Sequence, residues 1–492
     1  MKNMLSRNLI NKNFSLIQNN LETDEDFVID YERFCGMIDY WKIMLVEKYH
    51  AGPGKTVMLE FNLTDAYYYS AVFAVWELGM IMIVDWPHAY NQEDATSYRM
   101  TMHGKIDYAI VYHRQTDPTD RQFYSYWDHQ RNLLNCKVLI TDKEFDNYSI
   151  KDHTQFKSIS SNILCSENDY AVWTASGGTT GLPKQIKITH KEIYLQAKRL
   201  VDHLNFKEGE NTLHTNNLHH GASMCYHFLP SFMSCHRHYV FNGDDQFESY
   251  YQNLNKIVTQ RKINKVLLYS SNKLLGFLEI IPRLNHNLDI VTLFYVNKRC
   301  VELLHEKNIN SIRNVFGDTT IGYGFLVKIV NQSIFPDTYK SECIGPKLDD
   351  FFDFKIEDES LYVQCKGLGE TNWKTSHDKF KVIDNKYYFY GRGNNYRICD
   401  EWINLSELDA KVNTFFPLDG ATVVIDKEEQ QLYLSVWQDN SLGEQQFHNW
   451  LASKYQHVRV NKVARDLEYN QYENGRKIDR QKLKNYFRNL NS

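Results

Sequence analysis

Hydrophobic and polar positions along the chain predict helices and strands that take turns up to about residue 392. Residues 31–48 place Phe34, Ile38, Trp41 and Leu45 on one helical stripe. Short apolar runs between polar segments are typical of buried strands. Such strands are predicted at residues 55–61, 80–84, 108–112, 137–141, 265–270 and 290–296, with a helix at 300–307.

The residues that flank one predicted helix are suited to begin and end it. Thr64 and Asp65 precede the apolar segment 66–78, and their oxygens can accept N–H groups of a first helical turn. Gly79 follows, and glycine readily adopts the left-handed conformation that ends helices. The alternation of helices with buried strands predicts an α/β fold whose sheets are covered by helices.

A different pattern follows residue 392. It predicts a compact α+β set with strands at 422–426, 432–437 and 457–460, a turn at 427–431 and a helix at 446–455. We therefore predict a large N-terminal domain over residues 1–392 and a small, mobile C-terminal domain over residues 393–492. A motif, rather than a change in composition, marks this boundary.

Composition narrows the classes of protein that fit. The 492 residues include 56 basic and 61 acidic side chains, a formal net charge of −5, so no general attraction to nucleic acid or anionic lipid is expected. No apolar run approaches the roughly 18 residues of a membrane span, and the N-terminus lacks a signal-peptide pattern. Nine cysteines are scattered without a CxxC pair. We predict a cytoplasmic protein without nucleic-acid or membrane partners.

The segment "ASGGTTGLPK", residues 175–184, has the composition of a phosphate-binding loop. Its glycines can expose backbone N–H groups to an anion, and its hydroxyls and lysine add donors and a positive charge. Ile186 and Ile188 alternate afterwards, so the loop joins two strands, and a capping box at Thr189 to Glu192 begins the next helix. A polar hairpin without a ligand is the alternative.

A Walker loop is not the explanation for this segment. That loop needs GxxxxGK[ST] between a strand and a helix. The other candidate, "AGPGKT" at residues 51–56, has Tyr49 where the first glycine should stand. It is predicted to form the turn before the strand at Val57.

Four further motifs follow the loop in a fixed order. They are "NLHHGASMCYHFLP" at 217–230, "NVFGDTT" at 314–320, "WKTSHDKFKVIDNKYYFYGR" at 373–392 and "NGRKIDR" at 474–480. With the loop, they resemble the signatures of the adenylate-forming superfamily, which includes acyl-CoA synthetases, peptide-synthetase adenylation domains and luciferases. Asp378 stands fourteen residues before Arg392, as in that family. The probability that five motifs agree in this order by chance is very small.

The resemblance implies a reaction. Family members join a carboxylic acid to ATP, with Mg2+, to give an acyl adenylate and pyrophosphate, and most then pass the acyl group to a thiol of CoA or of a carrier protein. In the first step the carboxylate of the acid and the α-phosphate of ATP, which are both anionic, must be neutralised and aligned. The chain lacks the FDxS segment that supplies an amine-binding aspartate in peptide synthetases, so an acyl or aryl acid is expected, and any carrier protein would be a separate partner.

The resemblance also implies roles for individual residues. Lys477, Thr179 and His220 would be catalytic, with Lys477 bridging the carboxylate and the α-phosphate. The acyl pocket would include His219, His220, Gly221 and Tyr323, the hinge Asn394, and the magnesium site Thr180 and Thr320. ATP or AMP would contact Ser176, Gly177, Gly178, Thr179, Thr180, Gly181, Lys184, Phe316, Gly317, Asp318, Thr319, Asp378 and Arg392.

Several of these residues also have a structural alternative to the functional role. Asp378 is also a possible turn carboxylate, Phe316 a core residue, and Arg392 and Lys477 solvated charges. The joint order of the motifs, and not any single residue, favours the functional interpretation.

The chain departs from the family pattern at several positions. Thr320 stands where the family has a magnesium-binding glutamate, and a neutral hydroxyl is a poorer ligand for a hard cation. The altered hinge makes the second, thioester-forming step less certain than the first. The other departures are Gly178 for a hydroxyl residue, Gln185 and His377 for glycines, Asn394 at the hinge, Asp400 or Glu401 near the thiol path, and Arg476 inserted before Lys477.

Other chemistries and outcomes compete with this interpretation. Eight histidines and cysteines offer zinc ligands, but their spacing matches no common zinc module. No GxSxG motif is present, and Cys225 shows no sign of activation. Transfer to an amine or hydroxyl, and a nucleotide-binding pseudoenzyme, remain alternative functions. The eight side chains are His214, His219, His220, Cys225, His227, Cys235, His236 and His238.

Overall fold

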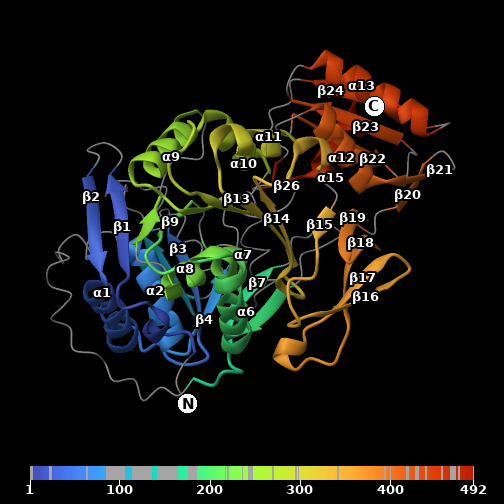
Figure 1. Cartoon of the computed structure of the whole chain (residues 1–492). Coiled ribbons are helices and arrows are strands. Elements are labelled where there is room, and N and C mark those ends of the chain that lie inside the picture. The colour runs from blue at the N-terminus through green and yellow to red at the C-terminus, as the bar shows by residue number, and fades with distance from the viewer. Residues whose placement is uncertain are drawn as a thin grey trace.

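The computed structural model of the chain has the predicted α/β architecture, with a large N-terminal part and a small C-terminal part (Figure 1). None of the described helices is long and apolar enough to cross a membrane. The structure describes residues 4–490 except 21–24, 62–64, 85–105, 113–135, 141–164, 176–184, 216–217, 219–220, 235–236, 242–247, 269–270, 294–295, 297, 341–342, 393–394, 399–400, 417–419, 427–430, 438–439, 456–457, 466–472 and 475–476.

A six-stranded sheet forms one layer of the N-terminal part. Five of its strands are parallel, and the edge strand β8 runs antiparallel to its neighbour β7. Every residue of β4 is buried, as expected for a parallel strand covered on both faces. The order is β6 (Lys137–Ile140), β5 (Tyr108–Tyr112), β3 (Thr56–Phe61), β4 (Ile81–Val84), β7 (Tyr170–Ala175) and β8 (Gln185–Thr189).

An eight-stranded sheet forms the second layer. Its six inner strands are parallel, and the edge strands β14 and β2 are antiparallel to their neighbours. The order is β14 (Gly322–Asn331), β13 (Ser311–Asp318), β12 (Asp289–Leu293), β11 (Lys265–Leu268), β9 (Asn211–His214), β10 (Arg237–Val240), β1 (Ser15–Asn20) and β2 (Glu25–Asp30).

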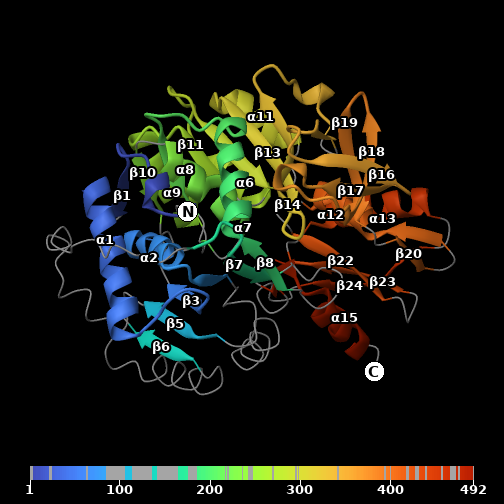
Figure 2. The same cartoon turned by 90° about the horizontal axis from the view of Figure 1, so that it is seen from below.

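Helices fill the space between these sheets and cover the outer face of the larger one. Figure 2 shows the inner helices lying between the two sheets, where one hydrophobic cluster joins them to both. A second cluster packs the outer helices on the eight-stranded sheet. The inner helices are α1 (Tyr31–Ile43), η2 (Met44–Lys48), α2 (Ala66–Glu77), α6 (His190–His203), α7 (Gly221–Ser223), η4 (Met224–Phe228) and α8 (Leu229–Ser234), and the outer ones are α9 (Glu248–Gln260), α10 (Ser271–Ile280) and α11 (Lys298–Lys307).

An antiparallel sheet follows in the chain and carries its own hydrophobic cluster. It lies beside the β13–β14 hairpin in both views (Figures 1 and 2). Its order is β15 (Cys343–Gly345), β19 (Lys386–Arg392), β18 (Lys374–Ile383), β17 (Ser360–Gln364) and β16 (Asp353–Glu357); short 3-10 turns are η1 (Arg7–Leu9), η5 (Pro336–Thr338) and η6 (Lys366–Leu368).

The C-terminal part is a small α+β unit with a separate hydrophobic cluster. A three-stranded sheet in the order β22-β23-β24 is its centre. The boundary at residue 392 stays a prediction, because residues 393–394 lie outside the described chain. The elements are β20 (Asn395–Ile398), β21 (Glu401–Asn404), α12 (Leu405–Phe415), β22 (Ala421–Asp426), β23 (Gln431–Val436), α13 (Ser441–Lys454), β24 (Val460–Arg465), β25 (Glu473–Asn474), β26 (Lys477–Ile478) and α15 (Arg480–Asn489).

The helix caps confirm the local predictions. Asp65 accepts the N–H of Tyr68 at the start of α2, and Gly79 has φ 65° just after its end. Phe34, Ile38, Trp41 and Leu45 are all buried on the first helical stretch. Burial of each such side chain contributes roughly 1.5–3 kcal/mol to stability.

One strand prediction was wrong in position. A strand was expected at 457–460, but β24 begins at Val460, the last residue of that segment, and runs to Arg465. The register of β24 with β23 begins at the pair Leu432 and Val460. Val458 is fully buried before the strand begins, so its apolar character reflects packing within the hydrophobic cluster of the C-terminal part and not strand pairing.

Candidate nucleotide and acyl site

The predicted phosphate loop connects two strands. β7 ends at Ala175 and β8 begins at Gln185, and the two strands pair antiparallel with Ala175 opposite Gln185. The strand-to-strand setting is therefore confirmed, and the Walker arrangement of strand, loop and helix is excluded for it. The loop residues 176–184 lie outside the described chain, so the roles predicted for Ser176, Thr179, Lys184 and their neighbours stay predictions.

Helix α6 leads directly from this hairpin. The capping box is present: Thr189 accepts the N–H of Glu192 at 3.2 Å, and the Glu192 carboxylate accepts the N–H of Thr189 at 2.5 Å. Farther along, Gln196 accepts the N–H of Tyr323, and Arg199 donates to the carbonyl of Tyr323 at 2.6 Å. A single helix thus links the loop hairpin to strand β14.

The sequence motifs did not reveal the roles of Gln196 and Arg199. Arg199 also donates to both carboxylate oxygens of Asp349 at 3.1 Å, and its guanidinium lies 5.0 Å from the ring centroids of Phe351 and Phe352. The local signal was their spacing of three residues, which places two polar side chains on one face of a helix beside buried Ala197 and Leu200.

The motif at 314–320 covers the end of β13, up to Asp318, and the start of the turn to β14. Asp318 accepts hydrogen bonds from the backbone N–H of Thr320, at 2.8 Å, and from the Thr320 hydroxyl. The Thr320 hydroxyl is thus engaged within the turn, and Asp318 supplies the negative charge there. Gly317 and Thr319 flank Asp318 in the chain.

Phe316 connects this turn to the neighbouring antiparallel sheet. Its half-buried ring lies 5.4 Å from that of Phe380 on β18 and 5.9 Å from that of Phe389 on β19. One side of Phe316 therefore packs in a hydrophobic cluster, which agrees with the alternative prediction that it is a core residue. The ring nevertheless remains partly exposed.

Asp378 and Arg392 lie opposite each other on that sheet. Their Cα atoms are register partners on antiparallel β18 and β19, and Asp378 is only 3% exposed. The backbone N–H of Asp378 donates to the Ser376 hydroxyl at 3.2 Å. The side chain of Arg392 lies outside the described part of the chain. Because Phe316 contacts Phe380 on β18 and Phe389 on β19, the strands that carry these three predicted nucleotide contacts meet there.

Two tyrosine–glycine contacts join helices α7 and η4 to the β13–β14 hairpin. The Tyr226 hydroxyl accepts the N–H of Gly324 at 2.7 Å, and it would lie 2.5 Å from a Cβ at Gly317. The Tyr323 hydroxyl would lie closer than 3.0 Å to a Cβ at Gly221, a separation that real Cβ atoms essentially never show. The elements predicted to line the acyl pocket are thus in close contact.

The histidine cluster does not form a metal centre among the described residues. Fully buried His214, His227 and His238 have ring centroids 5.1–5.8 Å apart, and their Nε2 atoms lack a hydrogen-bond partner in the described chain. No group of three described His, Cys, Asp or Glu side chains is arranged to hold a metal ion. His219, His220, Cys235 and His236 lie outside the described residues.

Burial determines the ionisation of these groups. It lowers the pKa of His214 to about 3 and holds the pKa values of His227 and His238 well below their usual range. Burial also raises the pKa of the Cys225 thiol, which keeps it protonated and a weak nucleophile, as the sequence interpretation expected.

Only the backbone of the predicted catalytic lysine is described. Lys477 pairs with Asn474 across the two short strands β25 and β26, and Asp479 caps helix α15 immediately afterwards. Asn394, Asp400 and Arg476 lie outside the described chain, so the hinge and the inserted arginine stay predictions.

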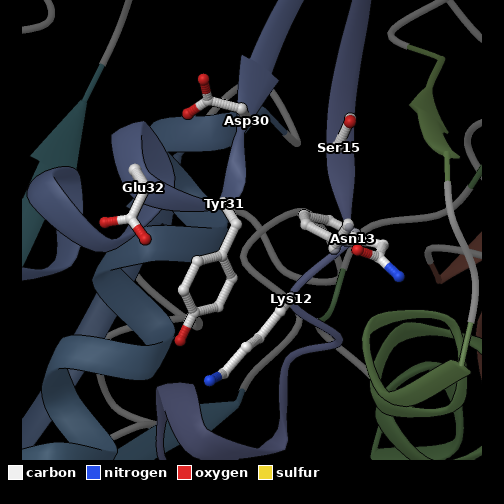
Figure 3. A pocket seen from close by; sticks show the side chains of 7 residues that line it. Lys12, Asn13, Ser15, Asp30, Tyr31 and Glu32 are labelled. Atoms are coloured by element: carbon white, nitrogen blue, oxygen red, sulfur yellow. The ribbon is translucent and has the colours of Figure 1, made fainter.

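A surface pocket of about 440 Å³ lies elsewhere, at the start of α1 (Figure 3). Asp30 is engaged there as the cap of α1, where it accepts the N–H of Arg33 at 2.8 Å. Burial raises the pKa of Tyr31 to about 12. None of the residues predicted from the motifs lines this pocket, whose lining is Lys12, Asn13, Phe14, Ser15, Asp30, Tyr31 and Glu32.

Comparisons with known proteins agree with the fold. Residues 48–269 match the family model described as AMP-binding enzyme. No curated protein matches the chain in sequence.

Solved structures share the fold over nearly the whole chain. The anthranilate CoA ligase AuaEII in complex with anthranoyl-AMP has a TM-score of 0.72 and 14% identity, covering 98% of this chain and 96% of its own. ATP-bound MatB from Rhodopseudomonas palustris has a TM-score of 0.74 and 12% identity, with both chains fully covered. O-succinylbenzoate coenzyme A synthetase from Bacillus subtilis, in complex with ATP and magnesium ion, has a TM-score of 0.73 and 14% identity, covering 98% and 99%.

These findings show a family match within the N-terminal part and a fold shared along the chain. The AMP-binding match covers the loop hairpin, helix α6 and the motif at 217–230, and the shared fold extends through the C-terminal part. Residues 48–269 match the AMP-binding enzyme family, and the chain shares its fold with solved coenzyme A ligases.

Proposed function

We propose that the protein is an AMP-forming ligase that activates a carboxylic acid. A carboxylate oxygen attacks the α-phosphorus of ATP, and the bond from that phosphorus to the oxygen that bridges the α- and β-phosphates breaks. Pyrophosphate departs, and the product is an acyl adenylate. The observation that carries this proposal is the contact of Phe316 with Phe380 and Phe389, which joins the end of β13 to the two strands that carry Asp378 and Arg392.

The residues divide the task of holding ATP. The Asp378 carboxylate is suited to accept hydrogen bonds from both ribose hydroxyls, because a carboxylate only accepts and forms strong charge-assisted bonds. The partly exposed ring of Phe316 stacks on adenine, and the loop 176–184 holds the phosphates with backbone N–H groups and Lys184. Lys477 neutralises the two anionic groups that must meet in the reaction.

ATP enters as its magnesium complex. The turn fits a cation only through Asp318, because Thr320 offers a neutral hydroxyl that already donates to Asp318. Asp318 would therefore take over the negative charge that the family places at position 320. The neighbour from Bacillus subtilis, which was solved with ATP and magnesium ion, supports this cofactor assignment.

The second step is transfer of the acyl group to a thiol, of CoA or of a separate carrier protein. Rotation of the C-terminal domain about the segment around Asn394 would replace Lys477 at the site. Neighbours named as CoA ligases support a thiol acceptor. Transfer to an amine or hydroxyl is the alternative for the same adenylate.

A nucleotide-binding protein without chemistry is the second candidate function. The specific observation that favours it is Thr320, whose hydroxyl is bonded to Asp318 where the family has an acidic metal ligand. ATP would bind without turnover if the turn held the nucleotide but the negative charge at the α-phosphate were poorly neutralised.

Exchange of radioactive pyrophosphate into ATP, with a panel of carboxylic acids, tests the proposal. We expect acid-dependent exchange that falls at least about 100-fold in Lys477→Ala, because a charge that acts in the transition state is lost. The matched control is Lys482→Ala, an exposed lysine on α15 five residues later, which should keep the exchange. ATP binding without exchange for any acid would reject the ligase and favour the second candidate.

The acceptor is identified in a further assay. CoA, a phosphopantetheinylated carrier protein or hydroxylamine is added to the preformed adenylate, and AMP release is measured. Acceleration by CoA or carrier protein supports thioester formation, whereas acceleration by hydroxylamine alone points to an amine or hydroxyl acceptor.

A further inference from the structure

The β18–β19 hairpin ends in a tip with exposed apolar side chains. Asp384 and Asn385 join the two strands with φ values of 50° and 58°, as in a tight two-residue turn. Val382 and Ile383, the last residues of β18, are 46% and 50% exposed. Because neighbouring residues of a strand point to opposite faces, both faces of the tip are open to solvent.

Packing within the sheet does not explain why these two positions are apolar, since neither side chain belongs to the hydrophobic cluster of that sheet. Charged side chains flank them. Lys381 precedes the apolar pair, and Asp384 and Lys386 follow it, and all three are exposed. The tip therefore presents two positive charges and one negative charge around two aliphatic side chains.

The pocket at the start of α1 has the opposite balance of charge (Figure 3). Asp30 and Glu32 give it two exposed carboxylates, and Lys12 gives it one positive charge. Phe14 and Tyr31 line it with aromatic carbon. Its volume of about 440 Å³ lies in the range of roughly 300–1,000 Å³ that is typical of pockets for small groups.

The tip and the pocket are therefore complementary in charge. The two lysines of the tip match the two carboxylates of the pocket, and Asp384 matches Lys12. Complementarity of this kind favours one partner over others. Helix α1 and strand β18 lie on opposite sides of the molecule in both views, so the tip cannot reach the pocket of its own chain (Figures 1 and 2).

We propose that the hairpin tip, residues 381–386, docks into the pocket at the start of α1 of a second copy of the protein. Val382 and Ile383 enter the pocket beside Phe14 and Tyr31. The contact is head-to-tail, so each pair keeps one unused tip and one unused pocket, to which further copies add. The surface is small, and contacts that bury less than about 1,200 Å² are typically weak and transient. None of the residues of the proposed function takes part.

Sedimentation velocity of the full chain at increasing concentration tests the proposal. We expect the average sedimentation coefficient to rise between about 10 and 500 μM, as for a weak association. Ile383→Asp places a charge on the apolar tip, and Glu32→Lys sets a positive charge against the lysines of the tip. Each change should weaken the association at least about 10-fold.

The variants are chosen so that folding is preserved. Ile383 and Glu32 are both exposed in the single chain, and circular dichroism checks that each variant is folded. The matched control is Leu442→Asp, which changes an apolar side chain on α13 that is 64% exposed. It should associate as the wild type does.

A mixture of the two variants tests the head-to-tail geometry. Ile383→Asp keeps an intact pocket, and Glu32→Lys keeps an intact tip. An equimolar mixture should therefore form one-to-one pairs with about the wild-type affinity and nothing longer, whereas each variant alone stays monomeric.

Three results would overturn the proposal. The first is a wild-type protein that remains monomeric at every concentration. The second is association that persists in Ile383→Asp or is lost equally in Leu442→Asp. The third is loss of association in both variants without recovery in their mixture, which would reject the pairing of tip with pocket.

Discussion

The Tyr226 hydroxyl accepts the backbone N–H of Gly324 at 2.7 Å, which joins a helix of the acyl motif to the hairpin of the nucleotide motif. The same hydroxyl fills the space beside Gly317, where a Cβ would lie 2.5 Å from it and 2.7 Å from the Gly324 nitrogen. Gly317 is thus required by a close approach of two elements. Its φ is not positive, so the requirement is one of space and not of backbone conformation.

Gly317→Ala should therefore damage the turn. The methyl group must displace either a hydroxyl or a backbone nitrogen, and we expect a loss of about 1–3 kcal/mol in the free energy of unfolding and a higher KM for ATP. Urea unfolding and pyrophosphate exchange measure these effects. Gly52→Ala is the control, since a Cβ there meets nothing within 4 Å. Equal behaviour of the two variants would contradict the packing argument.

Asp378→Asn should weaken nucleotide binding without unfolding the sheet. The amide keeps the size of the carboxylate but loses its charge, and hydrogen bonds to a charged group contribute about 1.5–3 kcal/mol each. We expect the KM for ATP to rise at least about 10-fold. Asp384→Asn, at the exposed turn between β18 and β19, is the control and should keep the wild-type KM. An unchanged KM in Asp378→Asn would assign that residue to structure alone.

Arg199→Met should be strongly destabilising. The change removes the guanidinium that pairs with the Asp349 carboxylate and leaves the carbonyls of Tyr323 and Gly324 without that donor, and the loss of one partner of a buried ion pair costs about 3–5 kcal/mol. Lys191→Ala removes a surface pair with Glu167 and should cost about 1 kcal/mol or less. Urea unfolding compares the two, and a loss in Arg199→Met no larger than in the control would refute the prediction.

The three buried histidines predict lower stability in acid. In the folded chain they stay neutral, with the pKa of His214 near 3, whereas in the unfolded chain they take up protons below about pH 6.5. The unfolded state therefore binds more protons as the pH falls from about 6.5, and each histidine removes up to about 1.4 kcal/mol per pH unit. Their contribution is fully present above that range.

His238→Gln tests this dependence. The free energy of unfolding, measured in urea between pH 7 and pH 5, should fall less steeply in the variant by about one third of the histidine contribution. His448→Gln changes a histidine on α13 whose side chain is 38% exposed, and should leave the slope as it is. Identical slopes for His238→Gln and the wild type would show that the cluster does not control acid stability.

Local patterns were sufficient to predict much of the fold. The apolar run 170–173 and the alternation at 185–189 predicted two strands around the loop 176–184, because each strand buries side chains along its own length. The capping box could also be predicted from the sequence, because its two partners, Thr189 and Glu192, are only three residues apart.

Long-range contacts had no such signal. Arg199 and Asp349 are 150 residues apart, and the contact of Tyr323 with Gly221 depends on how a helix meets a hairpin. The strand expected at 457–460 was misplaced because Val458 is apolar for a packing reason and not for strand pairing. The π-helical turn Met44–Lys48 also follows α1 without a sequence pattern that distinguishes it from an α-helix.

Helix α6 begins at the strand that leaves the phosphate loop and, two turns later, holds the backbone of Tyr323. One helix therefore links the β7–β8 hairpin to the β13–β14 hairpin. A change at one hairpin that shifts this helix would also act at the other, and by thermodynamic reciprocity the coupling has the same size in both directions. Replacing the β13–β14 hairpin alone would therefore also disturb the strands that flank the loop 176–184.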